Sequence, residues 1–267
     1  MRFFPFGNIT YDELHYMEKL TSNGLADVTA VILAGGLGTR LRSVVADRPK
    51  VLAEVHGRPF LAYLLDQLAA AGIRYVVLCT GYLGEQVEAV FGHSYRDMDI
   101  VYSQESLPLG TAGALRLACP FFKSDTVLVM NGDSFCDADL AAFWNWHGEQ
   151  RVPATLLLTQ VPDTTRYGRV QVGANGRIVS FVEKGHTSGR GWINAGIYLF
   201  TRHLLQTIPP GRSVSIEKES FPRWIDQGLS GYQSEGRFID IGTPESYARA
   251  EAFFASKNKR LLSVKVG

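Results

Sequence analysis

A Gly-rich segment near the start of the chain carries residues that suit phosphate binding. Residues 33–42 read LAGGLGTRLR and follow the apolar run TAVIL at 29–33. Glycines allow backbone N–H groups to close around an anion, and the guanidinium of Arg40 can contact two phosphate oxygens at once. Lys50 follows Pro49 a short way along the chain. We therefore predict a backbone cradle that holds a triphosphate together with Arg40 and Lys50.

The loop differs from two widespread nucleotide-binding patterns. The P-loop pattern G-x-x-x-x-G-K-[ST] is absent from the chain. No third glycine stands three residues after Gly38, so the dinucleotide-binding fingerprint is not matched either. A tight turn with a solvated Arg40 is the alternative interpretation, and the loop alone does not decide between the two.

Short apolar runs alternate with helical patterns after the loop, which predicts parallel strands joined by crossover helices. The predicted strands are 29–33, 75–80, 99–103 and 126–133, and the predicted helices are 60–72, 84–92 and 110–118. Ligands of such sheets bind beyond the carboxyl ends of the strands. The Gly-rich loop, Gly81 and Gly132-Asp133 all follow strands, so we expect them to meet at one site.

The chain becomes rich in β pattern after residue 150. The later β segments are 154–161, 168–184 and 192–200, and the later helical patterns are 215–228 and 244–256. We predict one α/β domain over 29–267, with a first half at about 29–150 and a β-rich second half at about 151–255. Residues 1–28 are expected to form an N-terminal extension that docks on the domain or on a partner subunit.

Composition sets limits on partners and location. Of 267 residues, 46% are apolar and 20% are charged, and the formal net charge is +1. A balanced charge provides no general attraction to nucleic acid or to an anionic membrane, and no apolar run approaches the roughly 20 residues of a transmembrane helix. We therefore expect neither as a partner. Cys79, Cys119 and Cys136 show no C-x-x-C spacing, which favours reduced thiols in a cytoplasmic protein.

Six segments in register resemble the motifs of sugar-1-phosphate nucleotidylyltransferases, also called NDP-sugar pyrophosphorylases. They are the Gly-rich loop with the following RPKVLAEVHGRPFLAYLL, and then YSQESLPLGTAGAL (102–115), MNGDSF (130–135), FVEKG (181–185), WINAGIYLF (192–200) and FIDIGTPESY (238–247). The resemblance covers about residues 29–255. It implies a Rossmann-like, mostly parallel sheet flanked by helices, with a nucleotide-binding first half and a β-rich, sugar-binding second half.

The same resemblance implies a Mg²⁺-dependent reaction in which an NTP and a sugar 1-phosphate give an NDP-sugar and pyrophosphate. The nucleophile is a phosphate oxygen whose second pKa is about 6, so no general base is needed at neutral pH. The task of the site is then positioning and charge neutralisation. Asp133 and Asp240 match the metal-binding carboxylates of the family, and hard oxygen ligands suit Mg²⁺. A turn cap before Gly242 is the alternative role for Asp240.

The resemblance assigns roles to further residues. The cations implied in catalysis are Arg40, Lys50 and Lys184. The residues implied to bind the nucleotide are Leu33, Ala34, Gly35, Gly36, Gly38, Thr39, Gly81, Gln104, Gly110 and Thr111. The residues implied to bind the sugar are Gly132, Glu183, Lys184, Asn194 and Gly196. Gln104 would read the base with its amide, Glu183 would accept from sugar hydroxyls, and Lys184 would hold the sugar phosphate. The alternatives are an exposed strand end for Gln104 and an exposed ion pair for Glu183 and Lys184.

Within the family, SVVADRPKVLAEVHGRPFLAYLL and SIEKESFP are most similar to the branch that makes GDP-D-glycero-α-D-manno-heptose, a sugar nucleotide for lipopolysaccharide, capsule or S-layer glycans. GTP and the heptose 1-phosphate are therefore the expected substrates. Glucose or mannose 1-phosphate with UTP, dTTP or GTP remain alternatives.

A function of a different class is a catalytically inactive regulatory subunit that binds sugar nucleotides. Such a protein would be expected to lack one of Arg40, Lys50, Asp133, Lys184 or Asp240, and all five are present. The N-terminal extension is also compatible with a homodimer.

Overall fold

The structure is a computed structural model that describes residues 24–256, except Leu37, Arg42, Ala46, Glu183 and Thr187. Most of the predicted N-terminal extension therefore lies outside the described residues. Within the described part, eight strands form one sheet in the order β13-β9-β12-β7-β1-β4-β6-β5. They are β1 (Thr29–Leu33), β4 (Tyr75–Thr80), β5 (Ser94–Tyr95), β6 (Met98–Gln104), β7 (Thr126–Asn131), β9 (Ala154–Val161), β12 (Gly191–Thr201) and β13 (Leu229–Ser234).

The sheet is mostly parallel, as the sequence predicts. β1 runs parallel to β4 and β7, β4 to β6, and β13 to β9. The antiparallel strand β12 lies between β7 and β9 and continues the same sheet into the second half of the chain. The carboxyl ends of β1 and β7 therefore lie side by side, which positions the loops that follow them.

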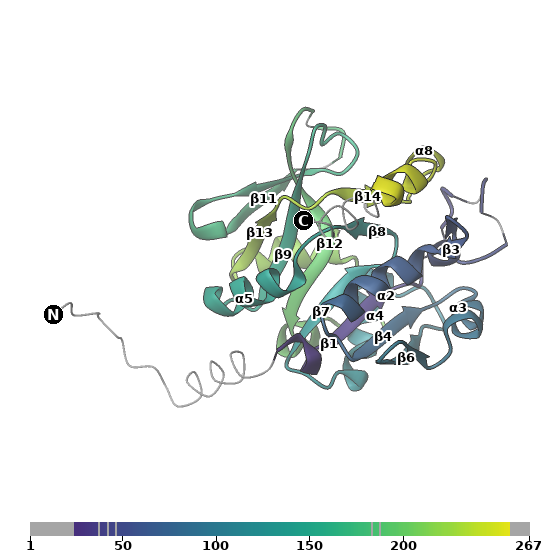
Figure 1. The fold of residues 1–267 in the computed structure, drawn as a ribbon. Helices are drawn as coiled ribbons and strands as arrows, with labels where there is room; N and C mark the ends of the chain where they lie inside the picture. Colours follow the sequence, from purple (N-terminus) through teal and green to yellow (C-terminus); the bar gives the residue numbers. More distant parts are fainter. Residues whose placement is uncertain are drawn as a thin grey trace, which may run out of the picture.

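Helices cover both faces of the sheet (Figure 1). The α-helices of the described residues are α2 (Phe60–Ala70), α3 (Gly84–Phe91), α4 (Gly110–Ala118), α5 (Leu140–Gln150), α6 (Arg202–Gln206), α7 (Phe221–Trp224) and α8 (Pro244–Tyr247). Successive residues of a strand point to opposite faces, and β1 follows this rule. Ala30 and Ile32 are buried in a core with α2 and α5, whereas Val31 is buried in a second core with α4, α6 and α7.

Three short two-stranded ribbons complete the described part of the fold. They pair β2 (Glu54–Val55) with β3 (Arg58–Pro59), β8 (Ser134–Cys136) with β14 (Phe238–Asp240), and β10 (Arg169–Val172) with β11 (Ile178–Val182). The β8–β14 ribbon lies between α8 and the central strands (Figure 1). Asp240 pairs with Ser134 in this ribbon, so two segments far apart in sequence reach the same edge of the sheet.

Two predicted helices are interrupted. Within 215–228, a π-helical turn at Ile216–Ser220 precedes α7, and Pro222 stands at the start of α7, where a proline is tolerated. Ser215 accepts a hydrogen bond from Lys218 N, as expected of an N-cap. Within 244–256, α8 is followed by a break at 248–249 and by helical residues 250–256. Thr243 caps α8 with a capping box.

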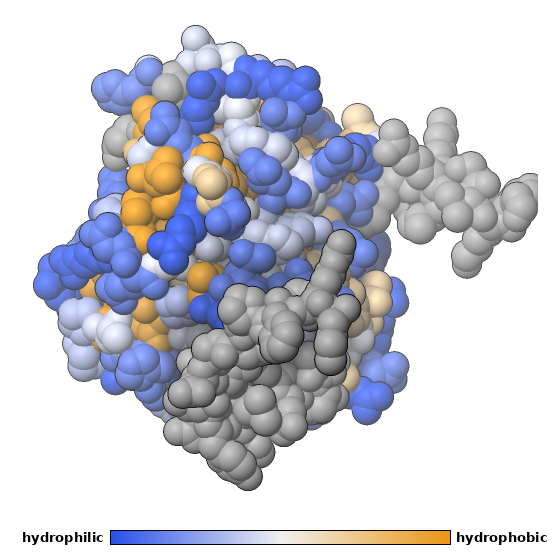
Figure 2. Space-filling model, turned by 90° about the vertical axis from the view of Figure 1, so that its left-hand side faces the viewer, coloured by the Kyte–Doolittle hydropathy of each residue, from blue (hydrophilic) through white to orange (hydrophobic). Residues whose placement is uncertain are grey.

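The described surface is mostly polar on the face shown in Figure 2, with apolar residues gathered in patches on its left-hand part. Among the described residues, no helix is long and apolar enough to cross a membrane.

Candidate functional site

A cavity of about 630 Å³ lies where the carboxyl ends of β1 and β7 meet the β8–β14 ribbon. This volume is in the range of small-molecule sites. Among the described residues, eleven of those predicted from the sequence line it: Leu33, Gly35, Gly36, Arg40, Gly110, Thr111, Asp133, Lys184, Asn194, Gly196 and Asp240. The loops that follow separate strands therefore meet at one site.

The other predicted residues are not part of the described lining. They are Ala34, Gly38, Thr39, Lys50, Gly81, Gln104 and Gly132, whereas Glu183 lies outside the described residues. Two of them join strand ends through the backbone. Ala34 N donates to Cys79 O at 2.8 Å, and Gly132 N donates to Leu33 O at 3.0 Å. These bonds hold the carboxyl ends of β4, β1 and β7 in one row.

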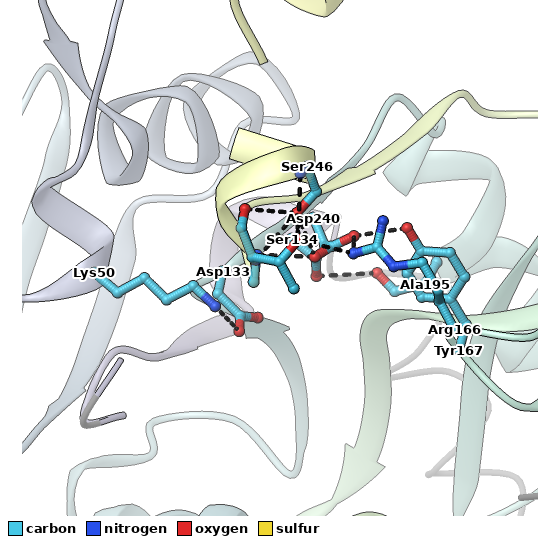
Figure 3. Close-up of polar contacts among 10 residues, drawn as sticks. Lys50, Asp133, Ser134, Arg166, Tyr167, Ala195, Asp240 and Ser246 are labelled. Carbon is cyan, nitrogen blue, oxygen red and sulfur yellow. Dashed lines mark hydrogen bonds and ion pairs between the residues drawn. The ribbon is translucent and has the colours of Figure 1, made fainter. Parts of the chain in front are cut away.

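Lys50 forms an ion pair with Asp133, with 2.8 Å between Nζ and Oδ2 (Figure 3). Lys50 begins a short 3₁₀ turn whose next residues, Val51 and Leu52, are buried. The rest of the chain covers its side chain to 10% exposure, whereas that of Asp133 is 45% exposed. Lys50 is therefore largely covered. Its ammonium group is paired with the Asp133 carboxylate, and that carboxylate lines the cavity.

Asp240 ends β14 with both carboxylate oxygens engaged. Oδ2 accepts from the Tyr167 hydroxyl at 2.6 Å, and Oδ1 accepts from Gly242 N at 2.8 Å and from the Ser246 hydroxyl at 3.0 Å. Arg166 lies 3.6 Å away, on the side of Asp240 opposite to Lys50 and Asp133 (Figure 3). Burial alone would raise the pKa of Asp240, but these hydrogen bonds and Arg166 lower it below its ordinary value. Asp240 is thus held as an anion.

The charges on the described lining nearly cancel. Three cations, Arg40, Arg166 and Lys184, face four carboxylates, Glu105, Asp133, Glu217 and Asp240, and Lys50 pairs with Asp133. A triphosphate bound here would therefore contact cationic side chains in a cavity that is not strongly positive. A divalent cation bound with the triphosphate would offset the negative phosphate charge that these side chains do not neutralise.

A turn in β12 shapes the side of the cavity away from β6. The register of β12 against β9 shifts between Asn194 and Tyr198. Asn194 Oδ1 accepts from Gly196 N at 2.9 Å, and its amide nitrogen donates to Tyr198 and to Glu217. Gly196 has φ of +76°, and a Cβ there would lie 2.6 Å from Ser134 Oγ, so glycine is required. The turn directs an amide and a carboxylate toward the cavity.

Several lining residues were not identified from the sequence. They are chiefly Glu105, Arg166, Tyr167 and Glu217. Arg166 and Tyr167 stand in the loop between β9 and β10 and carry no pattern that marks them. Glu217 falls in a predicted helix, where an acidic residue in the first turn is explained by the helix dipole. Glu105 could have been considered beside Gln104 from the sequence, because the two residues are adjacent and successive strand residues point to opposite faces.

The chain resembles known proteins along most of its length. The family described as nucleotidyl transferase matches residues 29–257. The chain is 40% identical over 229 residues to a mannose-1-phosphate guanylyltransferase of Mycobacterium tuberculosis, covering 84% of this chain and 64% of that protein. It is 36% identical over 223 residues to a D-glycero-α-D-manno-heptose 1-phosphate guanylyltransferase of Aneurinibacillus thermoaerophilus, covering 83% and 96%.

Solved structures agree with these matches. A crystal structure of HddC from Yersinia pseudotuberculosis superposes with a TM-score of 0.77 at 32% identity, covering 85% of this chain and 99% of that one. The same protein complexed with GMP-PN gives a TM-score of 0.76. The chain spans less than two thirds of the length of the Mycobacterium relative but nearly all of the Aneurinibacillus relative and of HddC. The fold, the converging loops and the matches over most of the chain agree, and the chain belongs to the nucleotidyl transferase family.

Proposed function

We propose that the protein is a sugar-1-phosphate guanylyltransferase that converts GTP and a sugar 1-phosphate to a GDP-sugar and pyrophosphate. The observation that carries this proposal is the convergence of the Gly-rich loop, Asp133, Asp240 and Lys184 on one cavity. The choice of GTP rests on the relatives from Mycobacterium and Aneurinibacillus, both of which are named guanylyltransferases.

The reaction forms a bond between a sugar-phosphate oxygen and the α-phosphorus of GTP. It breaks the bond between that phosphorus and the oxygen that links it to the β-phosphate, and pyrophosphate leaves. The attacking phosphate is largely dianionic at neutral pH, since its second pKa is about 6. The side chains therefore need to align the reactants and neutralise charge, not to move a proton. Arg40 and Lys50 would hold the triphosphate, and Lys184 would hold the sugar phosphate.

The residues at the site fit a Mg²⁺ ion. Only two acidic side chains, Asp133 and Asp240, are predicted as ligands, and the described residues contain no cluster of three or more potential metal ligands. Mg²⁺ is commonly held by one or two carboxylates together with substrate phosphates and water. Each carboxylate oxygen accepts more than one bond, so the partners of Asp240 leave it able to bind. When bound, the ion would supply positive charge for the reacting phosphates.

For the sugar, we propose D-glycero-α-D-manno-heptose 1-phosphate, with mannose 1-phosphate as the second candidate because of the Mycobacterium relative. A manno-configured sugar has an axial 2-hydroxyl that needs an acceptor. Glu217 and Asn194 line the cavity and contact each other, and they supply acceptors for this hydroxyl. The predicted Glu183 would be a further acceptor. A site built to bond a hydroxyl rejects an analogue that leaves its polar groups unpaired.

Several further expectations accompany this function. The first half of the chain would bind the nucleotide and the second half the sugar. The three cysteines are buried free thiols, which supports a cytoplasmic location. The homodimer remains a prediction.

The test is a matrix of nucleoside triphosphates against sugar 1-phosphates with Mg²⁺, scored by pyrophosphate release. We expect the highest kcat/KM for GTP with the heptose phosphate, a lower value for mannose 1-phosphate and a still lower one for glucose 1-phosphate. A preference for UTP or dTTP with glucose 1-phosphate would refute the substrates but keep the reaction class. No turnover with any pair would favour the inactive regulatory subunit.

A further inference from the structure

The segment at 212–216 packs against the first turn of α4 through its backbone. Val214 O accepts from Ala112 N at 3.0 Å, and Val214 N donates to Leu109 O at 2.8 Å. A Cβ on Gly110 would lie 2.6 Å from Val214 O, so glycine permits this close approach. The first N–H groups of a helix lack acceptors within that helix. In α4 a carbonyl from a segment far along the chain supplies one, and this carbonyl joins the two elements.

A side-chain hydrogen bond extends this contact into the π-helical turn at Ile216–Ser220. Thr111 Oγ1 accepts from Ile216 N at 2.9 Å, across 105 positions of sequence. Ile216 is the first residue of the turn, where an N–H again lacks an acceptor within the helix. Thr111 and Ile216 both line the cavity. The oxygen of Thr111 is therefore engaged by the turn, although the sequence assigns this residue to the nucleotide.

The next residue of the turn is Glu217, whose carboxylate lines the cavity. Its Oε1 accepts from the Asn194 amide at 3.2 Å, so it lies beside the turn of β12. Two further bonds, from Lys218 N to Ser215 Oγ and from Ser215 N to the Glu219 carboxylate, stay within this part of the chain. The Thr111 bond differs from them because it links the turn to α4.

We propose that Thr111 is a positioning residue for the sugar, because its bond to Ile216 N fixes the turn that presents Glu217 to a sugar hydroxyl. Binding side chains work best when neighbouring hydrogen bonds hold their geometry, and π-helical turns occur frequently at functional sites. The proposal rests on the function proposed above, which places a manno-configured sugar beside Glu217 and Asn194. The competing role for Thr111 is direct contact with the nucleotide.

GDP-mannose and GDP provide a matched pair of probes, because only the first carries a sugar. Calorimetry with Mg²⁺ would compare both on the wild-type protein and on Thr111→Val, which keeps the shape of the side chain and removes the acceptor. We expect Thr111→Val to weaken GDP-mannose about threefold to tenfold and GDP less than about twofold. Thr111→Ser keeps a hydroxyl and should bind GDP-mannose within about twofold of wild type. In turnover, the KM for mannose 1-phosphate should rise while the KM for GTP stays.

A double-mutant cycle tests whether Thr111 acts through Glu217. Glu217→Gln should weaken GDP-mannose about tenfold or more, since a hydrogen bond to a charged group is lost. The double variant with Thr111→Val and Glu217→Gln should then bind GDP-mannose within about twofold of Glu217→Gln alone. Two losses that multiply would mean that the residues act independently, and this result would overturn the proposal.

Thr29→Val is the matched control. Thr29 Oγ1 accepts from Lys123 N at 2.9 Å, which is the same kind of bond between distant segments. Thr29 is the first residue of β1, at the end of the strand away from the cavity. Its loss should leave the affinities for GDP-mannose and GDP unchanged.

Three further results would overturn the proposal. One is equal weakening of GDP and GDP-mannose in Thr111→Val, which would assign Thr111 to the nucleotide. Another is unchanged binding of GDP-mannose by Glu217→Gln, a variant that does not depend on folding of Thr111→Val. The third is failure of the wild-type protein to bind GDP-mannose.

The outcomes also separate this proposal from the function on which it rests. Turnover with an unchanged KM for the sugar phosphate in Thr111→Val would reject Thr111 and leave the guanylyltransferase standing. The expected pattern of GDP-mannose affinities in a protein that releases no pyrophosphate with any sugar phosphate would reject the enzyme and leave Thr111 standing.

Discussion

The ammonium of Lys50 donates to the carboxylate of Asp133 at 2.8 Å. The sequence assigns the first residue to the triphosphate and the second to the metal, and the structure joins them directly. Lys50 is nearly covered, whereas Asp133 lines the cavity. The negative charge of Asp133 holds the lysine in place, and under the proposed assignment it would also offer an oxygen to the metal ion.

Asp133→Asn keeps the size of the side chain and removes this charge. We expect turnover to fall on the order of a hundredfold or more, because a charge aimed at the reacting phosphates typically contributes that much. The Mg²⁺ concentration for half-maximal rate should rise as well. Steady-state kinetics over a Mg²⁺ titration would measure both, and chelation with EDTA should abolish the wild-type rate. Asp99→Asn, an exposed acid on β6, is the control. Normal turnover of Asp133→Asn at low Mg²⁺ would contradict the assignment.

Tyr167→Phe tests whether the hydroxyl that bonds Asp240 positions this carboxylate. The hydroxyl donates to Oδ2 at 2.6 Å, and burial followed by this bond raises the pKa of Tyr167 to about 12, so it stays a donor at neutral pH. Partners of a metal-binding side chain typically contribute about tenfold to a hundredfold in metal affinity or activity. We expect a rate loss of this size at low Mg²⁺ that saturating Mg²⁺ partly restores.

Tyr63→Phe is the matched control, because its hydroxyl donates to Val55 O outside the cavity lining. A loss in Tyr167→Phe that is the same at every Mg²⁺ concentration would argue for a packing role of Tyr167 instead.

The sheet could be predicted because its strands are apolar runs with clear ends. β1 and β4 occupy the predicted residues, and their carboxyl ends meet as parallel pairing requires. The partners of the site residues could not be predicted in the same way. Tyr167 reaches Asp240 through a loop whose path depends on tertiary packing, and Asp240 pairs with Ser134, the residue after Asp133, in the β8–β14 ribbon.

The adjacent residues at the end of β6 illustrate a second limit. Gln104 and Glu105 are adjacent, and the sequence offers an amide and an acid that could each bond a base. The face that each side chain takes depends on where β6 ends and on the turn that follows. A shift of one residue exchanges the two faces, so a motif alone does not choose between them.

Lys184→Ala and Arg40→Ala should separate the two phosphate sites. Both side chains line the cavity and are exposed, so neither substitution should disturb the core. Lys184→Ala should weaken binding of the sugar phosphate and leave binding of GTP alone near normal. Arg40→Ala should mainly lower kcat, because negative charge on the departing pyrophosphate grows in the transition state. Calorimetry and kinetics on both variants would measure this, and the opposite pattern would exchange the two assignments.

Gly110→Ala and Gly148→Ala should change stability in opposite directions. Gly110 begins α4 with φ of +68°, and a Cβ there would lie 2.6 Å from Val214 O. A left-handed non-glycine residue costs about 1–2 kcal/mol before this contact is counted. Gly148 lies in α5 with open space where a Cβ would stand, so alanine should stabilise the helix by about 0.5–1 kcal/mol. Urea unfolding would show both. We also expect Gly110→Ala to raise the KM for GTP, and unchanged stability of Gly110→Ala would count against the turn geometry.

The last prediction concerns His147, which is buried in α5 and shares a hydrogen bond of 2.7 Å with Thr155. Burial lowers its pKa from 6.5 to about 4, so the folded protein keeps it neutral where the unfolded chain binds a proton. The unfolded state thus holds more protons between about pH 4 and 6.5, and stability must fall as the pH falls through this window. Above about pH 6.5 this histidine does not lower the free energy of unfolding. At pH 4 it lowers the free energy of unfolding by about 3 kcal/mol. Urea unfolding at pH 7 and pH 4.5 should show a smaller difference in His147→Gln than in wild-type protein, since glutamine does not titrate. Parallel losses in the two proteins would mean that other groups cause the acid sensitivity.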